Sequence, residues 1–539
     1  MEKIWLKSYP PGVPAEIDIT PHGSLAGLLE AAFLKFASRT AFVCMGHELS
    51  YAGLDNRSRA LAAWFQSQGL EPGARIAVML PNLLQYPVTL AAILRAGYVV
   101  VNVNPLYTSR ELEHQLNDSG AQALVLLDAF LPTFNALGRN TQVRHVVVAS
   151  TGAQADTAPV VSHVTFEQAL RQGADAPFAR VAISPDDVAV LQYTGGTTGV
   201  SKGATLLHRN LIANVLQSEA WRAASVRGRD DIEQYVTVVA LPLYHVFGLT
   251  VCGLLSMRTG GLGILIPNPR DIPAMIRTLR GFTINTFPAV NTLFNALLND
   301  PDFASLDFSK LVQAAGGGMA VQQAVAARWQ AVTGVPLLEG YGLSETSPSV
   351  SSNPPGTTEF SGSIGVPLPS TEISIRDDDG REVPPGEPGE ICIRGPQVMA
   401  GYWNRPEETA SVMTPDGFFR SGDIGVMNER GFVKLVDRKK DMIIVSGFNV
   451  YPNEIEDVVA KHPGVFEVAA LGVPDAHSGE VVKLFIVRKD PALSQADIFA
   501  FCAQQLTGYK RPKLIEFRTE LPKSAVGKIL RRALRDSTG

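Results

Sequence analysis

The segment from Tyr193 to Gly203 combines glycines, hydroxyls and a lysine in the way that binding of a polyphosphate requires. It reads Tyr-Thr-Gly-Gly-Thr-Thr-Gly-Val-Ser-Lys-Gly. Glycines let backbone N–H groups approach a ligand, hydroxyls add donors and can face a Mg²⁺ ion, and an ammonium supplies a compact positive charge. A flexible surface turn is the alternative, although ordinary turns need fewer glycines. The candidate phosphate-binding residues are Thr194, Gly195, Gly196, Thr197, Thr198, Gly199 and Lys202, and Thr198 is also a candidate metal ligand.

Two familiar nucleotide-binding loops do not fit the spacing of this chain. A Walker A loop reads G-x-x-x-x-G-K-[ST], whereas Lys202 follows Ser201 and precedes Gly203. A Rossmann fingerprint reads G-x-G-x-x-G, whereas the glycines at 316–318 are followed by Val321 at the third-glycine position. The sequence therefore predicts a phosphate loop of another kind.

Other segments carry chemistry that is weak when each is taken alone. Gly340-Tyr-Gly-Leu-Ser-Glu-Thr346 joins an aromatic ring to a carboxylate, but a Gly-Tyr-Gly turn beside a solvated Glu is common. Asp423 stands in a glycine-flanked turn that an Asx-type turn would equally explain. His245 lies among apolar residues, where a core or surface histidine is the default. Lys528 precedes a basic stretch that we expect to be helical from that residue, and it would ordinarily face solvent.

Length and composition indicate a large globular protein. The chain has 539 residues, 45% apolar and 18% charged, so roughly three or four folding units are expected. Lysine plus arginine minus aspartate plus glutamate is 47 − 52 = −5, which argues against generic nucleic-acid binding. The four cysteines form no C-x-x-C pair, which indicates reduced thiols rather than a zinc site or a disulfide framework. The first residues lack the apolar region of a secretory signal, so we expect a cytoplasmic protein.

The stretch 236–257 has no Asp, Glu, Lys or Arg before Met257, and it approaches the length of a membrane span. Pro242, Tyr244 and His245 lie in its middle, and its first residues are typical of a buried strand. We therefore expect a core strand, a loop and a helix there.

An α/β fold class follows from the alternation of short β-rich runs with helical stretches. Strands are expected at 75–80, 122–127, 145–149, 188–193 and 236–241, and the phosphate-type loop follows the fourth. Ligands in open α/β sheets bind at the carboxyl ends of strands. After about Ser361, turns rich in Asp, Gly and Pro predict a small β-rich subdomain. The charged run 437–441 is a solvated turn or a hinge, and a compact α+β unit follows it.

These motifs together resemble those of the acyl-adenylate-forming ligases, the superfamily of acyl-CoA synthetases, luciferases and nonribosomal adenylation domains. The resemblance covers essentially the whole chain and is strongest to the bacterial long-chain-fatty-acid:CoA ligases, through the segments 102–120 and 437–456. The family usually has proline where this chain has Ser201, which bears on loop rigidity. The family implies a large N-terminal domain at 1–436, with two α/β subdomains and a β-barrel-like subdomain, a hinge at 437–441 and a small mobile C-terminal domain at 442–539.

The resemblance also implies roles for single residues. Tyr341 and its neighbours would line the adenine pocket, Glu345 would hold Mg²⁺, and Asp423 would accept hydrogen bonds from the ribose hydroxyls. Lys528 would bridge the substrate carboxylate and the α-phosphate, and His245 would stand at the acyl pocket entrance, where Leu249 replaces a tryptophan gate found in some members. Catalytic candidates are thus Lys528, His245 and Lys202; further cofactor-binding candidates are Gly316, Gly317, Gly340, Tyr341, Gly342, Asp423, Arg438 and Gly447; metal candidates are Glu345 and Thr198.

The implied reaction joins a long-chain fatty acid to CoA. A carboxylate resists nucleophilic attack, and transfer to the α-phosphorus of ATP converts it into an acyl-AMP that a thiol can displace. ATP, CoA and Mg²⁺ are the implied co-substrates and metal, and a homodimer and peripheral association with the inner face of the cytoplasmic membrane are further expectations. The alternatives are a medium-chain or aryl acid:CoA ligase, an acyl-AMP ligase that delivers to a carrier protein, and a noncatalytic acyl or nucleotide sensor.

Overall fold

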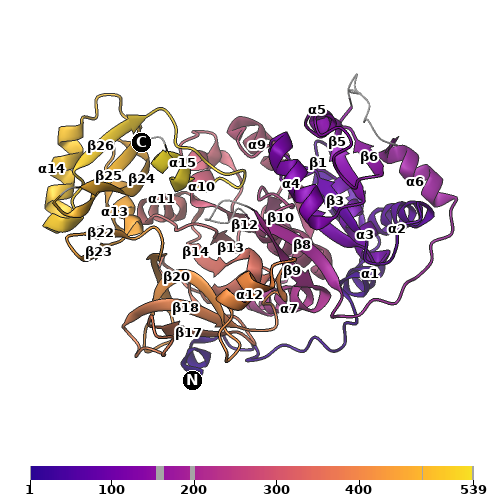
Figure 1. Ribbon diagram of the computed structural model, residues 1–539, viewed down its shortest axis with the longest axis horizontal. Coiled ribbons are helices and arrows are strands. Elements are labelled where there is room, and N and C mark those ends of the chain that lie inside the picture. The colour runs from indigo at the N-terminus through magenta and orange to yellow at the C-terminus, as the bar shows by residue number, and fades with distance from the viewer. Residues whose placement is uncertain (1, 153–162, 195–200, 476, 537–539) are drawn as a thin grey trace.

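The protein folds into a large body and a smaller unit formed by its C-terminal part (Figure 1). This computed structural model describes residues 2–152, 163–194, 201–475 and 477–536. Three sheets build the large body and a fourth builds the small unit. The α/β class and the division into a large and a small domain are confirmed.

The first sheet of the large body has nine strands in the order β16-β15-β14-β13-β12-β10-β11-β1-β2. Its central pairs are parallel, while the pairs at both ends are antiparallel. Helices α9, α10 and α11 pack on one face of this sheet through a cluster of buried apolar side chains. In this cluster the ring centres of Phe294 and Trp329 lie 4.7 Å apart. The strands are β1 Thr40–Cys44, β2 His47–Ser50, β10 Val236–Val239, β11 Leu262–Leu265, β12 Thr286–Ala289, β13 Gln313–Gly316, β14 Leu337–Gly342, β15 Ser349–Ser352 and β16 Val366–Pro367, and the helices are α9 Ile272–Leu279, α10 Asn291–Leu298 and α11 Gln323–Thr333.

The second sheet has eight strands in the order β19-β9-β8-β4-β3-β5-β6-β7, and its parallel pairs confirm the four expected strands that fall in it. Its strands are β3 Arg75–Met79, β4 Val99–Asn102, β5 Ala123–Leu127, β6 His145–Ala149, β7 His163–Thr165, β8 Val188–Thr194, β9 Lys202–Leu207 and β19 Gly401–Tyr402. The helices that accompany the two sheets are α1 Leu25–Lys35, α2 Tyr51–Ser67, α3 Gln85–Arg95, α4 Ser109–Ser119, α5 Leu131–Asn135, α6 Phe166–Ala174 and α7 His208–Ser225.

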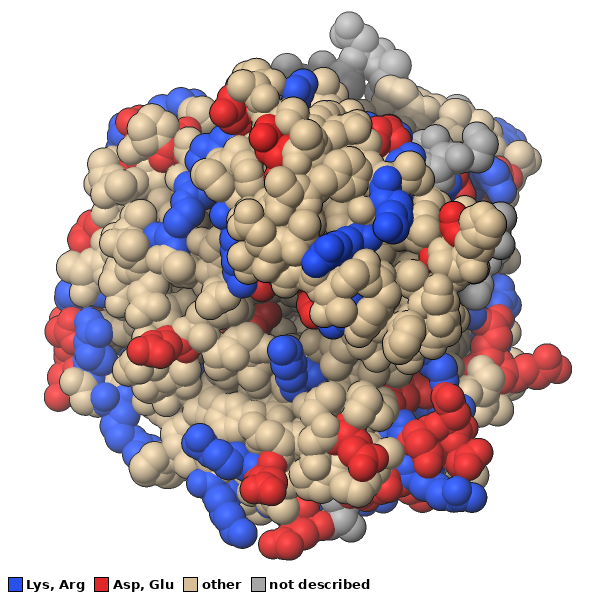
Figure 2. Space-filling view, turned by 90° about the vertical axis from the view of Figure 1, so that its left-hand side faces the viewer, with Lys and Arg blue, Asp and Glu red and all other residues tan. Residues whose placement is uncertain are grey.

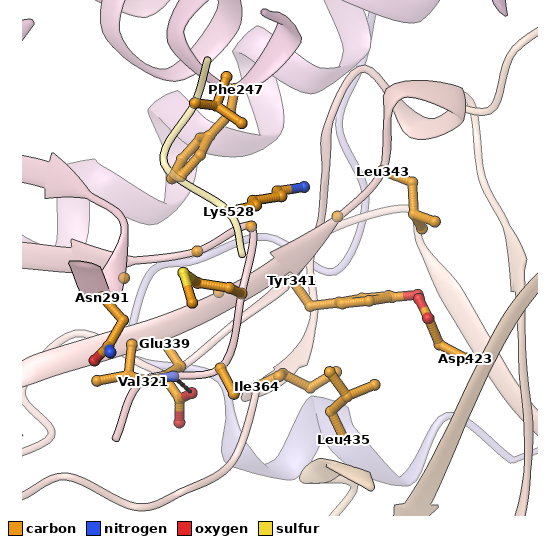
Figure 3. Close-up of a pocket in the computed structure, with 18 of the residues that line it drawn as sticks. Phe247, Asn291, Val321, Glu339, Tyr341, Leu343, Ile364, Asp423, Leu435 and Lys528 are labelled. Atoms are coloured by element: carbon orange, nitrogen blue, oxygen red, sulfur yellow. Dashed lines mark hydrogen bonds between the residues drawn. The ribbon is translucent and has the colours of Figure 1, made fainter. Parts of the chain in front are cut away.

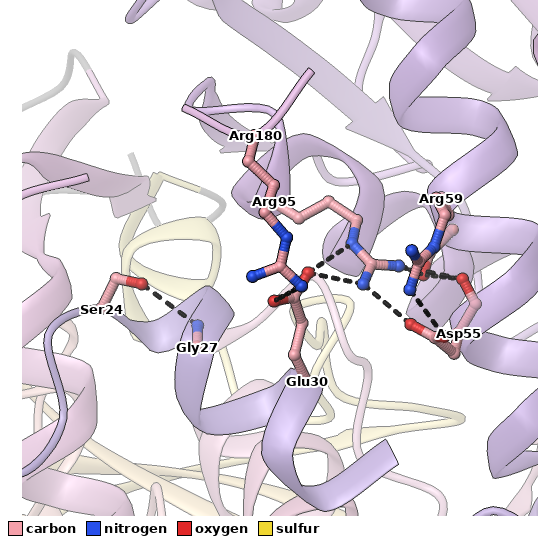
Figure 4. A network of polar contacts seen from close by, with 8 residues as sticks. Ser24, Gly27, Glu30, Asp55, Arg59, Arg95 and Arg180 are labelled. Carbon is pink, nitrogen blue, oxygen red and sulfur yellow. Dashed lines mark hydrogen bonds and ion pairs between the residues drawn. The ribbon is translucent and has the colours of Figure 1, made fainter. Parts of the chain in front are cut away.

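A buried arginine joins three of these helices (Figure 4). Arg95 ends α3, and its guanidinium donates to Glu30 of α1 at 2.6 Å and to Asp55 of α2 at 2.8 Å. A third donor of the same fork reaches Ser58 at 2.8 Å. A planar fork of donors suits several carboxylates at once, so this contact fixes the packing of α1, α2 and α3.

Residues 236–257, which approach the length of a membrane span, fold as the expected core strand, loop and helix. Strand β10 occupies its start, a loop carries His245, and a π-helical turn η3 (Gly248–Leu254) continues into α8 (Leu255–Thr259). No helix among the described residues is both long enough and apolar enough to cross a membrane.

The β-rich part after Ser361 forms a four-stranded antiparallel sheet below the other two (Figure 1). Its strands are β17 Glu372–Arg376, β18 Pro388–Arg394, β20 Phe419–Met427 and β21 Val433–Arg438, and α12 Pro406–Val412 lies between β18 and β20 in sequence. The N-terminal turn η1 (Ile4–Ser8) packs on this sheet, since Trp5 is buried against Gly431. Further single turns are η2 Asp128–Phe130, η4 Phe303–Ser305, η5 Ser344–Thr346 and η6 Gly508–Lys510.

The small domain is the expected α+β unit, with one correction. Its elements are β22 Ile443–Val445, β23 Phe448–Val450, α13 Pro452–Val459, β24 Val465–Asp475, β25 Gly479–Arg488, α14 Gln495–Gln505, β26 Leu514–Arg518 and α15 Arg531–Asp536. The terminal helix was expected to begin at Lys528, but it begins at Arg531. Gly527 has a φ of +81°, and Ser524 accepts from the amide of Lys528 at 3.1 Å, so Lys528 lies in a tight turn.

Candidate active site

A cleft of about 2330 Å³ opens where the carboxyl ends of the parallel strands of both large sheets face the small domain. Most ligand pockets measure roughly 300–1,000 Å³, so this cleft has room for more than one substrate. On the side of the molecule shown in Figure 2, acidic and basic side chains intersperse around a hollow. The candidate residues that line the cleft are Thr194, Lys202, His245, Gly316, Gly317, Gly340, Tyr341, Gly342, Glu345, Asp423, Arg438 and Lys528.

Six candidates are not placed in this cleft. Gly195, Gly196, Thr197, Thr198 and Gly199 lie outside the described residues. Gly447 is described, but it occupies an exposed turn between β22 and β23 and does not line the cleft. The structure therefore brings together residues from the large sheets, the four-stranded sheet and the C-terminal turn, and leaves the β22–β23 turn outside.

Lys528 enters the cleft from the small domain (Figure 3). Its side chain lies against Gly318, where an added Cβ would stand 3.1 Å from Cε of the lysine. Thr292 donates to the carbonyl of Gly527 at 2.9 Å and so fixes the preceding residue to the large domain. Burial and the charge of Arg438 lower the pKa of Lys528 to about 8, and the charges of Asp423 and Glu345 oppose this shift.

Two further contacts hold the small domain in this orientation. Asn295 donates to the carbonyl of Phe466 at 2.9 Å. The amide of Gln323, the first residue of α11, donates to the carboxylate of Asp457 at 3.0 Å. A carboxylate at a helix N-terminus satisfies an amide that has no partner within the helix and interacts favourably with the helix dipole. The domains are thus docked with Lys528 directed into the cleft.

A tyrosine and a carboxylate face each other across the cleft (Figure 3). Tyr341 Oη donates to Asp423 Oδ2 at 2.6 Å, and Arg438 Nε lies 3.3 Å from Asp423 Oδ1. Asp423 and Arg438 are register partners on β20 and β21, so the ladder itself sets their pairing. Burial and the neighbouring Asp423 raise the pKa of Tyr341 well above its ordinary value. The carboxylate of Asp423 is therefore oriented by Tyr341 and Arg438 and lies adjacent to an aromatic ring.

Glu339 binds the backbone just after the glycine turn that follows β13. The amide of Val321 donates to Glu339 Oε1 at 3.0 Å (Figure 3), and burial raises the pKa of this carboxyl to about 7. An added Cβ at Gly317 would stand 3.0 Å from the ring of Phe247. Backbone alone therefore fits beside Phe247 at this point of the cleft.

His245 is a neutral residue in this site. Burial and the charge of Lys528 lower its pKa to about 3. Its Nδ1 accepts from the amide of Phe247 at 3.3 Å, and the adjacent carbonyl of Tyr244 accepts from buried Gln192 at 3.0 Å. The ring is thus positioned as a hydrogen-bonding group rather than as a cation.

The base of the phosphate-type loop is formed by the antiparallel pair β8 and β9. Ser201 Oγ donates to the carbonyl of Thr194 at 2.8 Å, and Lys202 opposes Thr194 in the register. Lys202 Nζ forms an ion pair with Glu408 and lies 5.5 Å from the ring centre of Tyr402. The lysine is therefore held at the mouth of the loop.

Comparison with known proteins shows the family to which the chain belongs. Residues 29–403 match the AMP-binding enzyme family, and residues 454–528 match the AMP-binding enzyme C-terminal domain. The chain belongs to the AMP-binding enzyme family. A long-chain-fatty-acid–CoA ligase of Escherichia coli O6:H1 is 52% identical over 99% of this chain and 98% of its own length.

Solved structures resemble this AMP-binding enzyme along nearly its whole length. The anthranilate CoA ligase AuaEII in complex with anthranoyl-AMP has a TM-score of 0.87 at 26% identity, covering 97% of this chain and 99% of its own. ATP-bound MatB from Rhodopseudomonas palustris has a TM-score of 0.81 at 31% identity, covering 95% and 98%.

Two residues of this AMP-binding enzyme that contact candidate site residues were not predicted from the sequence. Tyr402 Oη donates to Glu345 Oε1 at 2.8 Å, and Glu408 pairs with Lys202. The only available signal was the turn-like run Gly-Tyr-Trp-Asn-Arg-Pro at 401–406, which names no chemistry. Their place became visible because β19 pairs with β9 and so brings 401–408 against the phosphate-type loop.

The carboxylate of Glu345 is a suitable ligand for a magnesium ion in an AMP-binding enzyme. Glu345 is buried and lines the cleft, and no cluster of three or more His, Cys, Asp or Glu that could hold a metal occurs among the described residues. Mg²⁺ usually binds through one or two carboxylates plus substrate phosphates and retains several waters, so a single carboxylate would be sufficient with a bound polyphosphate beside it.

Proposed function

We propose that this enzyme joins a long-chain fatty acid to CoA in two steps, forming an acyl-AMP with release of pyrophosphate and then an acyl-CoA with release of AMP. The observation that carries the proposal is the position of Lys528, which reaches from the small domain into the cleft beside Gly318. The 52% identity to a long-chain-fatty-acid–CoA ligase over nearly the whole chain supports the substrate class.

In the first step, the acid carboxylate attacks the α-phosphorus and pyrophosphate leaves. Lys528 supplies a cation at the point where the carboxylate and the α-phosphate meet, and Lys202 holds the departing phosphates. Asp423 accepts hydrogen bonds from the ribose, and Arg438 stays beside it. His245 is neutral, so it orients the acid by hydrogen bonding without adding a second positive charge.

Glu345 and Thr198 are the residues that would hold Mg²⁺. When bound, the ion supplies neutralisation of phosphate charge. Tyr402 donates to one oxygen of Glu345 and so orients the carboxylate toward the cleft. This arrangement explains why a residue outside the recognised motifs lies beside the phosphate site.

The second step requires another orientation of the small domain. We place the pivot at 437–441, where β21 ends at Arg438 and β22 begins at Ile443. Rotation there would withdraw Lys528 and bring the exposed turn at Gly447 toward the cleft, next to the pantetheine thiol of CoA. Peripheral membrane association and homodimerisation stay predictions on which this scheme does not depend.

The first experiment measures pyrophosphate release from MgATP with fatty acids of increasing length and with aryl acids, each with and without CoA. Release that peaks with long chains, and acyl-CoA that forms only when CoA is present, would support the proposal. Release that peaks with aryl acids would favour the aryl alternative, since AuaEII is named an anthranilate ligase. Release without acyl-CoA would favour a carrier-protein acceptor.

The Lys528→Ala variant tests the residue that carries the argument. We expect acid-dependent pyrophosphate release to fall by about 10²- to 10³-fold, because a positioned donor to developing charge is lost. Nucleotide binding, measured by calorimetry with ATP, should remain close to that of the parent. An unchanged rate would contradict the assignment of Lys528.

A further inference from the structure

A ring of side chains connects the two strands at the base of the phosphate-type loop. Its members, in order, are Tyr193 near the end of β8, Asp118 of α4, Arg405 just before α12, Glu408 in the first turn of α12 and Lys202 at the start of β9. The ring closes through the antiparallel pairing of β8 with β9, in which Lys202 opposes Thr194. Helices α4 and α12 are thereby linked to both strands that carry the loop.

The contacts on one side of this ring are short hydrogen bonds to Asp118. Tyr193 Oη donates to Asp118 Oδ2 at 2.6 Å, and Arg405 Nη2 donates to Asp118 Oδ1 at 2.8 Å. The side chain of Asp118 is only 11% exposed, so both oxygens of a shielded carboxylate have a partner. Charge-assisted bonds of this length are strong, and they hold the guanidinium of Arg405 in place.

On the other side of the ring, Glu408 lies between two cations. It forms an ion pair with Lys202, and its Oε1 lies 3.6 Å from Arg405 Nε. Its Oε2, which faces Lys202, is shielded from water. A separation of 3.6 Å is longer than an N–H···O hydrogen bond, so the carboxylate can still approach Arg405. A second partner for Glu408 is therefore already in place.

The two residues of the ion pair differ in their access to the cleft. Lys202 lines the cleft, whereas Glu408 is not one of its lining residues. A polyphosphate bound in the cleft would compete with Glu408 for the same ammonium, and its negative charge would repel the carboxylate. The lysine has a flexible stem and three donors, so its ammonium can turn toward either anion.

We propose that Glu408 is an exchangeable counter-ion of Lys202 and, through it, a positioning residue for the polyphosphate. When MgATP binds, Lys202 turns to the phosphates and Glu408 moves to Arg405. When pyrophosphate leaves, Glu408 recovers the ammonium. This inference rests on the proposed ligase function, and it adds that a carboxylate outside the cleft weakens the hold of Lys202 on ATP and assists the departure of pyrophosphate.

The experiment measures the Kd of MgATP by calorimetry and the Ki of pyrophosphate in CoA ester formation. Glu408→Gln removes the competing charge, so both constants should fall about two- to fivefold, as expected for a partly exposed ion pair. Glu408→Asp keeps the charge and should stay closer to the parent. Arg405→Gln removes the second partner of Glu408, so both constants should rise by a similar factor. A merely structural role would weaken binding in every variant.

A double variant separates exchange from the general effect of charge on ATP binding. In the Glu408→Gln background, Arg405→Gln should change neither constant, because Arg405 acts on Lys202 only through the carboxylate. Additive effects of the two substitutions would overturn the inference.

Glu407→Gln is the matched control, because Glu407 is exposed and belongs to the same first turn of α12. It removes an equal charge without changing a member of the ring, so both constants should equal those of the parent. Weaker ATP binding in Glu408→Gln, or an equal gain in Glu407→Gln, would overturn the inference and leave the ligase function intact. Failure of the parent to bind MgATP would instead count against the ligase function and this inference together.

Discussion

Lys528 is a cation whose charge depends on pH in the range where enzymes are assayed. Burial lowers its pKa to about 8, so the side chain is charged below that pH and becomes neutral as the pH rises through it. Because the first step needs the charged form, kcat/KM for acid-dependent pyrophosphate release should fall above pH 8 or so. The corresponding fall in kcat should occur at higher pH, because the phosphates of the bound substrate stabilise the charged form of Lys528. Initial rates between pH 6 and 10 check both limbs.

Lys528→Arg provides the control for this assignment. A guanidinium stays protonated throughout the assay range, so any residual activity of the variant should lose the alkaline limb. Persistence of the limb in this variant would assign the titration to another group.

Residues in motifs of recognisable chemistry could be predicted from the sequence, whereas the residues that contact and orient them could not. Lys202, Tyr341 and Asp423 stand in glycine-rich segments whose composition already suggests phosphate and nucleotide contacts. Glu408 and Tyr402 stand in a segment with no such composition. Their neighbours are set by the pairing of β19 with β9, which local sequence does not encode.

The side chain of Asn82 fixes the backbone path of residues 239–243, which lead into the loop that carries His245. Asn82 is buried, donates to the carbonyls of Val239 and Leu241 at 2.9 and 3.0 Å, and accepts from the amide of Leu243 at 2.8 Å. Asn82→Ala would leave these backbone groups without partners and should lower the free energy of unfolding by about 2–4 kcal/mol. Urea unfolding followed by circular dichroism measures this difference.

Asn117→Ala is the matched change in an exposed setting, where the amide donates to the carbonyl of Asn140 at 3.0 Å. Water replaces the lost partner there, so the free energy of unfolding should change by less than about 0.5 kcal/mol. Similar losses in both variants would refute the special role of Asn82.

At the scale of elements, periodicity predicted strands well and helix starts less well. The run Arg75–Met79 became β3, because its β-branched and apolar residues suit a strand that is buried on both faces. The terminal helix was misplaced by three residues, because its basic composition continues through Lys528 while Gly527 and Ser524 form a turn. The turn depends on the positive φ of Gly527, and a φ angle cannot be read from composition.

For the whole molecule, docking of the small domain should be adjustable without changing any candidate catalytic, cofactor-binding or metal-binding residue. Asp457 caps α11 across the interface through the amide of Gln323, and such contacts are worth about 0.3–1 kcal/mol. Asp457→Asn keeps the shape and removes the charge, so it should shift the population away from the orientation that presents Lys528. We expect pyrophosphate release to slow roughly two- to fivefold. Thioester formation from supplied acyl-AMP should be unaffected or faster, because the competing orientation is less populated. Single-turnover measurements separate the two steps.

Asp497→Asn distinguishes domain docking from simple loss of stability. Asp497 accepts from Ser494 in the capping box of α14, so it carries out the same kind of contact entirely within the small domain. It should lower the thermal stability of that domain and leave the ratio of the two half-reaction rates at the parental value. If both variants change that ratio equally, the contact at α11 acts through stability alone. If only Asp457→Asn changes it, the orientation of the small domain is set by a balance small enough for one carboxylate at a helix N-terminus to shift.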